Sequence, residues 1–275
     1  PKRGTFGAPD FVLKNKDIPV GYIETKDVGI NRLDILHKDK REVEQLERYR
    51  NGLNNLIYTD YLDFIFYKDG NVVSRIRIAD FDGKTITPKP ENFATLENLL
   101  LDFFVKKSIT IKSASKLAEL MAGKAKLVAD VIRQALESGD ANTSLHDQLN
   151  AFQNMLIHDI KPTEFADVYA QTIAYGMFAA RLHDSTLENF TRAEAASLIP
   201  KTNPFLRNLF GYIAGNDIDQ RIVWVVDSLA EIFSYTDVAD IMRDFGRQTK
   251  TTDPIIHFYE TFLTAYNPAL RKSRG

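Results

Sequence analysis

Two acidic residues and a lysine near the start of the chain have the types and spacing that metal-assisted hydrolysis requires. Asp10 follows a proline, and Glu24 and Lys26 lie two positions apart at the end of an apolar stretch. Mg²⁺ prefers a few carboxylate oxygens together with water, so Asp10 and Glu24 are the candidate metal ligands. A lysine beside such an ion can orient the attacking water or neutralise charge that develops on a phosphate. Asp10, Glu24 and Lys26 are therefore the candidate catalytic residues for phosphodiester hydrolysis.

Strand geometry brings two of these residues to one face. Val20 to Lys26 is short and β-rich and is expected to form a strand. Because strand side chains alternate, Glu24 and Lys26 share a face while Thr25 points away. Taken alone, the pattern is weak: it arises by chance in roughly one chain of this length in ten. The alternative interpretation is a surface ion pair between Glu24 and Lys26 on an ordinary strand.

The elements expected around these residues form a mixed α/β domain up to about Ala79. A helix is expected from Lys40 to Gly52, where apolar residues recur at helical spacing and a glycine stands at the end. Asp69-Gly70 between two β-rich runs predicts an antiparallel hairpin. The expected strands are Phe11 to Leu13, Val20 to Lys26, Leu56 to Thr59, Phe64 to Tyr67 and Val72 to Ile78.

The helix from Lys40 to Gly52 carries candidate DNA-binding residues. Gln45 and Tyr49 are four positions apart and lie on one helical face, Arg41 precedes Gln45 by one turn, and Arg48 lies beside Tyr49. Amide, phenol and guanidinium groups along one stripe can hydrogen-bond phosphate oxygens without reading sequence. The alternative is a solvated amphipathic helix in which Tyr49 packs against the sheet.

The remainder of the chain is expected to be a linker followed by an all-α domain. Residues 81–93 contain Asp82-Gly83 and Pro88-Lys89-Pro90, which interrupt regular structure. The predicted division is therefore residues 1–80, a linker at 81–93 and a helical connector at 94–275. Small residues between Tyr169 and Ala180 indicate close helix packing. The expected helices are Leu96 to Lys107, Ser113 to Glu137, Leu145 to His158, Thr163 to His183, Phe190 to Ala196, Pro204 to Ile213, Ile218 to Phe233, Val238 to Phe245 and Pro254 to Tyr266.

Composition restricts the classes of function. The 275 residues include 35 basic and 37 acidic side chains, so the chain does not hold nucleic acid by bulk charge. The absence of cysteine excludes disulfides, zinc–thiolate sites and cysteine nucleophiles. No apolar run is long enough for a membrane helix, and a cytoplasmic location is expected. Because the sequence begins at Pro1 and ends on a basic stretch, we expect it to be part of a larger protein.

These residues together resemble a known nuclease family. Asp10, Glu24-Thr25-Lys26 and the later Gln45-x-x-x-Tyr49 resemble the RecB-like branch of the PD-(D/E)xK nucleases. Longer segments look like the N-terminal nuclease and helical connector of single-chain type IIG and type ISP restriction-modification enzymes. Those segments are Gly7-Ala8-Pro9-Asp10-Phe11, Gly21 to Asp27, Asn55 to Tyr61, Asn203-Pro204-Phe205-Leu206, Tyr266-Asn267-Pro268 and Arg271 to Gly275.

The resemblance implies a fold, a cofactor and partners. It implies a restriction-endonuclease-like α/β core with Mg²⁺ held by Asp10 and Glu24. It also implies double-stranded DNA as substrate and covalently linked adenine-specific methyltransferase and target-recognition domains. Only nine residues precede Asp10, so we expect the nuclease core to be N-terminally incomplete, which puts the activity of this part alone in doubt. No methyltransferase motif is present, so S-adenosylmethionine is expected only in the missing part.

Two functional hypotheses follow from this sequence. The first is an endonuclease that cleaves DNA in the complete enzyme and, by itself, binds DNA weakly and without sequence preference. The second is a catalytically inactive nuclease-like module that docks domains or DNA. All three catalytic residue types are present, which favours the first.

Overall fold

The chain divides into two compact units, one formed mainly by Pro9–Lys107 and the other mainly by Ser108–Gly275. In the computed structural model, the parts whose structure can be described are residues 7–15, 18–34, 39–104, 111–138, 144–155, 157–184, 190–199, 204–214, 218–249 and 253–267. Residues 200–203 and 268–275, which carry part of the family resemblance, lie outside them. Each unit is described by itself.

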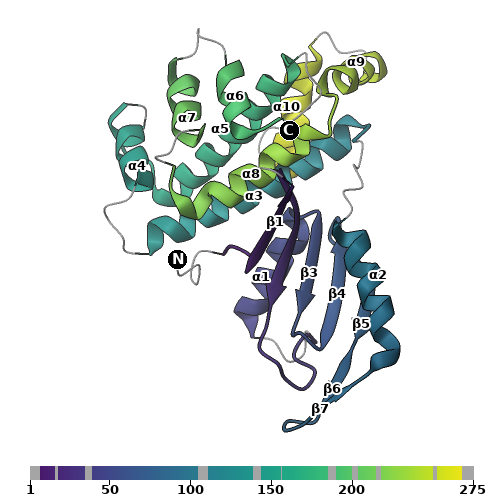
Figure 1. The fold of residues 1–275 in the computed structure, drawn as a ribbon. Helices are drawn as coiled ribbons and strands as arrows, with labels where there is room; N and C mark the ends of the chain where they lie inside the picture. Colours follow the sequence, from purple (N-terminus) through teal and green to yellow (C-terminus); the bar gives the residue numbers. More distant parts are fainter. Residues whose placement is uncertain are drawn as a thin grey trace. The chain divides into compact units, whose positions relative to one another are not determined.

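A mixed five-stranded sheet forms the centre of the first unit (Figure 1). Its order is β1-β2-β3-β4-β5, and only β2 and β3 run parallel. The strands are β1 (Phe11–Asn15), β2 (Ile18–Thr25), β3 (Asn55–Thr59), β4 (Asp63–Lys68) and β5 (Asn71–Arg77). The runs predicted for β1, β3 and β4 lie within these strands, whereas those predicted for β2 and β5 extend one residue beyond them, to Lys26 and Ile78. The turn at Asp69 and Gly70 joins β4 to β5 in an antiparallel pair, as expected from these two residues.

Helix α1 (Lys40–Gly52) connects β2 to β3 and has the bounds that the sequence predicts. Parallel neighbours need a crossover connection, and this helix supplies it. The Asp39 side chain accepts a hydrogen bond from the backbone N–H of Glu42 and so caps the helix. Leu46 and Tyr49 are buried, and they mark the helical face that packs inward.

Helix α2 (Phe93–Phe104) belongs to the first unit and covers one face of its sheet. Phe103 joins the core that includes Ile57 of β3 and Phe66 of β4. At Gly21 of β2, a Cβ atom would lie 2.6 Å from the Cζ atom of Phe103, so only glycine permits this close approach. Since side chains alternate along β2, the neighbours of Gly21 project to the other face.

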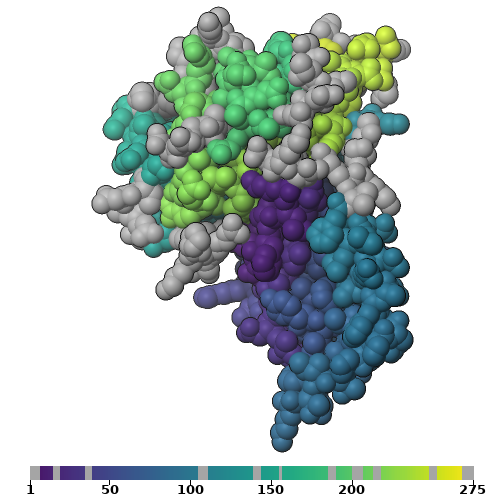
Figure 2. Space-filling model, in the orientation of Figure 1, coloured from purple at the N-terminus to yellow at the C-terminus, as the bar shows by residue number. Residues whose placement is uncertain are grey.

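The segment expected to be a linker has regular structure. It contains an antiparallel hairpin of β6 (Ala79–Phe81) and β7 (Ile86–Pro88), followed by a short 3₁₀ turn at Pro90–Asn92. The backbone N–H of Lys89 donates to the carbonyl of Ile78, which ties the hairpin to the end of β5. Figure 2 shows this hairpin projecting at the tip of the first unit. The observed division therefore differs from the expected boundary at residues 81–93, because α2 buries its apolar side against the sheet instead of joining the helical connector.

The second unit is helical in its described parts, as the sequence predicts for this region. α3 packs against α5, α8 and α10 and is the central helix. A Cβ atom on Gly176 would lie 2.4 Å from the ring of Phe210, which confirms the close helix packing predicted for this stretch. The helices are α3 (Ala114–Glu137), α4 (Ser144–Met155), α5 (Pro162–Leu182), α6 (Arg192–Leu198), α7 (Pro204–Ala214), α8 (Gln220–Ser234), α9 (Val238–Thr249) and α10 (Pro254–Tyr266). Within the described ranges, no helix combines the length and apolarity needed to cross a membrane.

Candidate active site

Glu24 and Lys26 form an ion pair at the end of β2. The Nζ atom of Lys26 lies 2.6 Å from Oε1 of Glu24. The two side chains are only 5% and 13% exposed, so this is not the solvated surface pair that the alternative interpretation describes. The shared face predicted from strand alternation is confirmed by this contact.

The second carboxylate oxygen of Glu24 is buried without a hydrogen-bond partner among the described residues. This atom, Oε2, is shielded from solvent. Burial raises the pKa of the Glu24 carboxyl, while the hydrogen bond and positive charge of Lys26 lower it. A buried carboxylate oxygen with no donor has a large desolvation cost, which a bound cation would offset.

Asp10 lies next to this pair but is held by the backbone and side chain of Thr25. Its Oδ2 accepts hydrogen bonds from the Thr25 backbone N–H at 2.8 Å and the Thr25 hydroxyl at 2.6 Å. The charge of Asp10 contributes to raising the pKa of Glu24, whereas its backbone N–H lowers that pKa. The antiparallel pairing of Phe11 with Ile23 explains this proximity, because it sets the residues before β1 beside the end of β2. The structure thus brings Asp10, Glu24 and Lys26 together.

Thr25 is a residue of the candidate site that the sequence pattern did not identify. Its hydroxyl and amide both orient the Asp10 carboxylate, although strand alternation directs its side chain away from Glu24. Asp10 immediately precedes β1, and the register of β1 against β2 places it beside Thr25. That register depends on pairing between strands, which a single strand's pattern does not specify.

Helix α1 extends the polar network through two of the predicted DNA-binding residues. Lys26 Nζ donates to Oε1 of Gln45 at 3.1 Å, and Nε2 of Gln45 lies 3.2 Å from the Tyr49 hydroxyl oxygen. Tyr49 is 0% exposed. It contacts Gln45 inside the unit, which differs from the expected phosphate-contacting stripe and matches the alternative of a tyrosine packed against the sheet. The reason is that the face shared by Gln45 and Tyr49 is the one that α1 buries.

Tyr58 completes the surroundings of the lysine. It lies opposite Glu24 in the parallel pair of β2 and β3 and is 1% exposed. Lys26 Nζ lies 5.7 Å from the centre of its ring, within range of a cation–π interaction. The ammonium group is thus held by a carboxylate, an amide oxygen and an aromatic face. Sequence reasoning missed Tyr58 because its neighbours depend on strand order.

The two predicted arginine contacts on α1 differ in exposure. Arg41 is exposed and Arg48 is half-buried. Neither takes part in the hydrogen-bond chain from Glu24 to Tyr49 described above. The exposed Arg41 and the half-buried Arg48 remain the candidates for contact with a phosphate backbone.

The donor set of the site suits a hard divalent cation. Across the part of the chain that the structure describes, no group of three or more His, Cys, Asp or Glu side chains is arranged to hold a metal. Two carboxylates, Asp10 and Glu24, remain as candidate ligands. Mg²⁺ retains several waters and is commonly bound through one or two carboxylates, so this pair fits it. The unpartnered Oε2 of Glu24 supports the same assignment.

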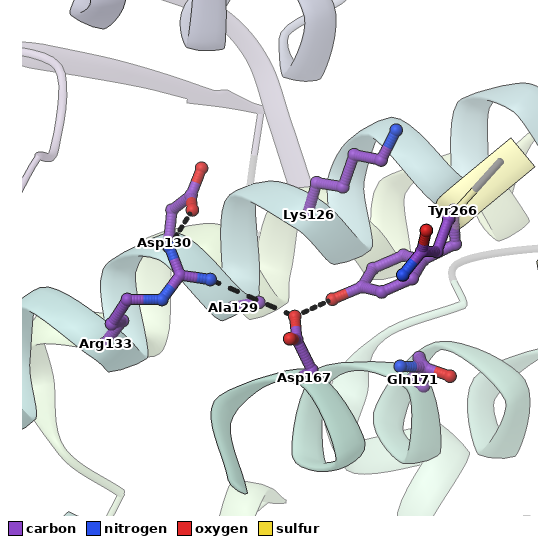
Figure 3. Close-up of a pocket in the computed structure, with 8 residues that line it drawn as sticks. Lys126, Ala129, Asp130, Arg133, Asp167, Gln171 and Tyr266 are labelled. Atoms are coloured by element: carbon purple, nitrogen blue, oxygen red, sulfur yellow. Dashed lines mark hydrogen bonds and ion pairs between the residues drawn. The ribbon is translucent and has the colours of Figure 1, made fainter. Parts of the chain in front are cut away.

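A polar cavity also lies in the second unit. It has a volume of about 250 Å³ and is lined by α3, α5 and α10 (Figure 3). Asp167 accepts a hydrogen bond from the Tyr266 hydroxyl at 2.6 Å and lies 3.9 Å from Arg133, which also pairs with Asp130 at 2.7 Å. Lys126 donates to the carbonyl of Ala265. Because its charged groups bind one another and the backbone, the cavity has a structural role in joining three helices.

Comparison of the chain with protein-family models, with curated proteins and with solved structures finds no match. The functional assignment therefore depends on the arrangement of the residues described above.

Proposed function

We propose that the first unit is the Mg²⁺-dependent endonuclease portion of a restriction-modification enzyme, of the PD-(D/E)xK class and its RecB-like branch. The observation that carries this proposal is the buried Glu24–Lys26 pair beside Asp10, with Oε2 of Glu24 lacking a hydrogen-bond donor among the described residues. A mixed sheet with a helix between its two parallel strands supplies the setting for these residues. The substrate is double-stranded DNA.

In this proposal each residue has a distinct task. Asp10 and Glu24 hold the cation, with Thr25 fixing the orientation of the Asp10 carboxylate. When bound, Mg²⁺ supplies positive charge at the phosphate and favours ionisation of water. Lys26 directs its ammonium protons to the water or to the phosphate oxygens that gain negative charge. Gln45 and Tyr58 restrict the position of that ammonium.

DNA contact is assigned to two arginines of α1. Arg41 and Arg48 bind backbone phosphates, which positions the duplex without reading its sequence. Gln45, and Tyr49 through Gln45, instead position Lys26. The helical unit then serves as a coupler to methyltransferase and target-recognition domains that supply sequence specificity.

A cleavage assay of the complete natural protein tests this function. The wild-type protein should convert duplex DNA to fragments only when Mg²⁺ is added, and Glu24→Gln should remove this activity because the amide cannot provide the charged ligand. Glu44→Gln is the matched control, since Glu44 lies on α1 with a side chain 59% exposed. Absence of Mg²⁺-dependent cleavage by the wild type, with DNA binding retained, would support the inactive docking module instead.

A further inference from the structure

Tyr61 is a half-exposed aromatic residue whose backbone adopts a conformation that is unfavourable for a bulky side chain. Its backbone φ is 70°, in the left-handed region that is uncommon for residues with a bulky side chain. Its side chain lies in solvent, with the residue 54% exposed, so the ring gains little from burial. A tyrosine at such a position contributes nothing evident to the fold. The exposed ring in this backbone conformation points to a use outside folding.

Hydrogen bonds from two buried side chains hold the turn that carries Tyr61. The Asp60 carboxylate accepts hydrogen bonds from the backbone N–H groups of Leu62 and Asp63. The Thr59 hydroxyl donates to the carbonyl of Asp63 and accepts from the N–H of Tyr61 at 2.9 Å. Asp60, Thr59 and Asp63 are all buried. The ring of Tyr61 is therefore presented to solvent from a fixed base.

This turn lies at the strand ends that carry the candidate active site. The backbone N–H of Lys26 donates to the carbonyl of Thr59 at 2.8 Å. Tyr61 lies two residues after Thr59. Two exposed apolar residues, Val28 and Ile30, follow Lys26 in the loop that leaves β2. Exposed large hydrophobic side chains thus follow the ends of both parallel strands, β2 and β3, beside the candidate site.

We propose that Tyr61 is a positioning residue that packs its ring against the DNA base next to the cleaved phosphate; this inference rests on the proposed nuclease function. A planar ring beside a phosphate-cleaving site suits a base because every base presents a flat aromatic face, and such stacking does not require a particular sequence. Exposed apolar side chains such as Val28 and Ile30 can also enter between base steps. Tyr61 would in this way fix the scissile phosphate relative to Lys26.

The test compares Tyr61→Gly with Tyr61→Phe in the complete protein. Glycine accepts the positive φ, so Tyr61→Gly removes the ring without adding backbone strain and should leave the melting temperature unchanged or raised. Phenylalanine keeps the ring. We expect Tyr61→Gly to weaken duplex binding and to lower kcat/KM by roughly tenfold to hundredfold, the range of base–aromatic stacking, while Tyr61→Phe stays near wild type. Val73→Ala, at another exposed apolar position, is the control.

A fluorescent base analogue separates stacking from a structural effect. 2-Aminopurine is placed next to the cleavage position mapped with the wild type, and binding is followed in EDTA so that no cleavage occurs. The emission should change on binding the wild type and Tyr61→Phe but not Tyr61→Gly. If the wild type cleaves DNA and Tyr61→Gly matches it in emission change and kcat/KM, this inference is wrong and the proposed function stands. A loss of activity accompanied by a fall in melting temperature also overturns it. If the wild type itself does not cleave, the proposed function fails.

Discussion

The Lys26 ammonium occupies one oxygen of the Glu24 carboxylate and leaves the other buried without a donor in the described part of the chain. This relationship lets one carboxylate serve two partners. Oε1 holds the lysine beside the candidate site, and in the proposed function Oε2 would bind the cation. The charge of Lys26 also opposes the effect of burial on the Glu24 pKa, which favours the ionised form that a metal needs.

Replacing the lysine should separate metal binding from cleavage. We expect Lys26→Ala to lower kcat by about 10²-fold or more, because it removes a positive charge from the region where the phosphate gains negative charge. Metal binding should persist, since a protonated amine is not a ligand. Cleavage kinetics together with Mn²⁺ titration measure both quantities. Lys40→Ala, with a side chain 90% exposed, is the control, and near-normal cleavage by Lys26→Ala would remove Lys26 from the mechanism.

Divalent cations should stabilise the wild-type protein through the two carboxylates. Saturation at about 100 times the dissociation constant contributes about 2.7 kcal/mol. This corresponds to an increase of several degrees in melting temperature when Mn²⁺ is added. The increase should disappear in Asp10→Ala and persist in Asp102→Ala, an exposed carboxylate on α2. Equal increases in all three proteins would show that the cation binds elsewhere.

The raised pKa of Glu24 predicts a pH dependence of local stability. Because the folded-state pKa lies above its ordinary value of 4.5, folding favours the protonated carboxyl. The resulting stabilisation is fully present below that ordinary value and is lost as the pH rises through the folded-state pKa. In Glu24→Gln this dependence is absent.

Hydrogen exchange of the β3 amides measures this effect without relying on the second unit. The opening free energy of the wild type, relative to Glu24→Gln, should fall as the pH rises from about 4 to about 8. Glu44→Gln, which changes a solvent-exposed carboxylate on α1, should retain the wild-type profile. A pH-independent difference between wild type and Glu24→Gln would contradict the proposed linkage.

Gln45 should affect the chemical step more than DNA binding. Its Oε1 accepts a hydrogen bond from Lys26, so Gln45→Ala frees the ammonium to adopt other positions. We expect kcat to fall by about tenfold or more, with little change in KM. Gln45→Glu keeps an acceptor oxygen and should retain more activity, whereas Glu44→Ala should behave as wild type. A rise in KM at unchanged kcat would instead place Gln45 in substrate binding.

DNA binding by this chain should be weak, independent of sequence and sensitive to salt. Its formal net charge of −2 restricts favourable contacts to local patches. Arg41→Ala and Arg48→Ala should each reduce the slope of log affinity against log salt by about 1. Anisotropy titrations with two unrelated duplexes of equal length provide the measurement. A strong preference for one duplex would mean that some part of the chain reads bases.

Local sequence pattern determined the elements and part of the site. The bounds of α1, the hairpin at Asp69 and Gly70, and the shared face of Glu24 and Lys26 were all predictable. Each depends on residues close in sequence, through helical spacing, turn conformation or strand alternation. The residue types also excluded thiolate metal ligands, because the chain contains no cysteine.

Only the tertiary structure decided which faces are buried and which strands are neighbours. Periodicity placed Gln45 and Tyr49 on one face of α1, but packing turned that face inward, so Tyr49 binds Gln45 instead of facing solvent. Likewise, α2 has the pattern of any amphipathic helix, and its assignment to the first unit depends on Phe103 filling the space above Gly21. Thr25 and Tyr58 joined the site through strand pairing. These relationships arise between residues distant in sequence, and a local pattern carries no information about which partner will cover it.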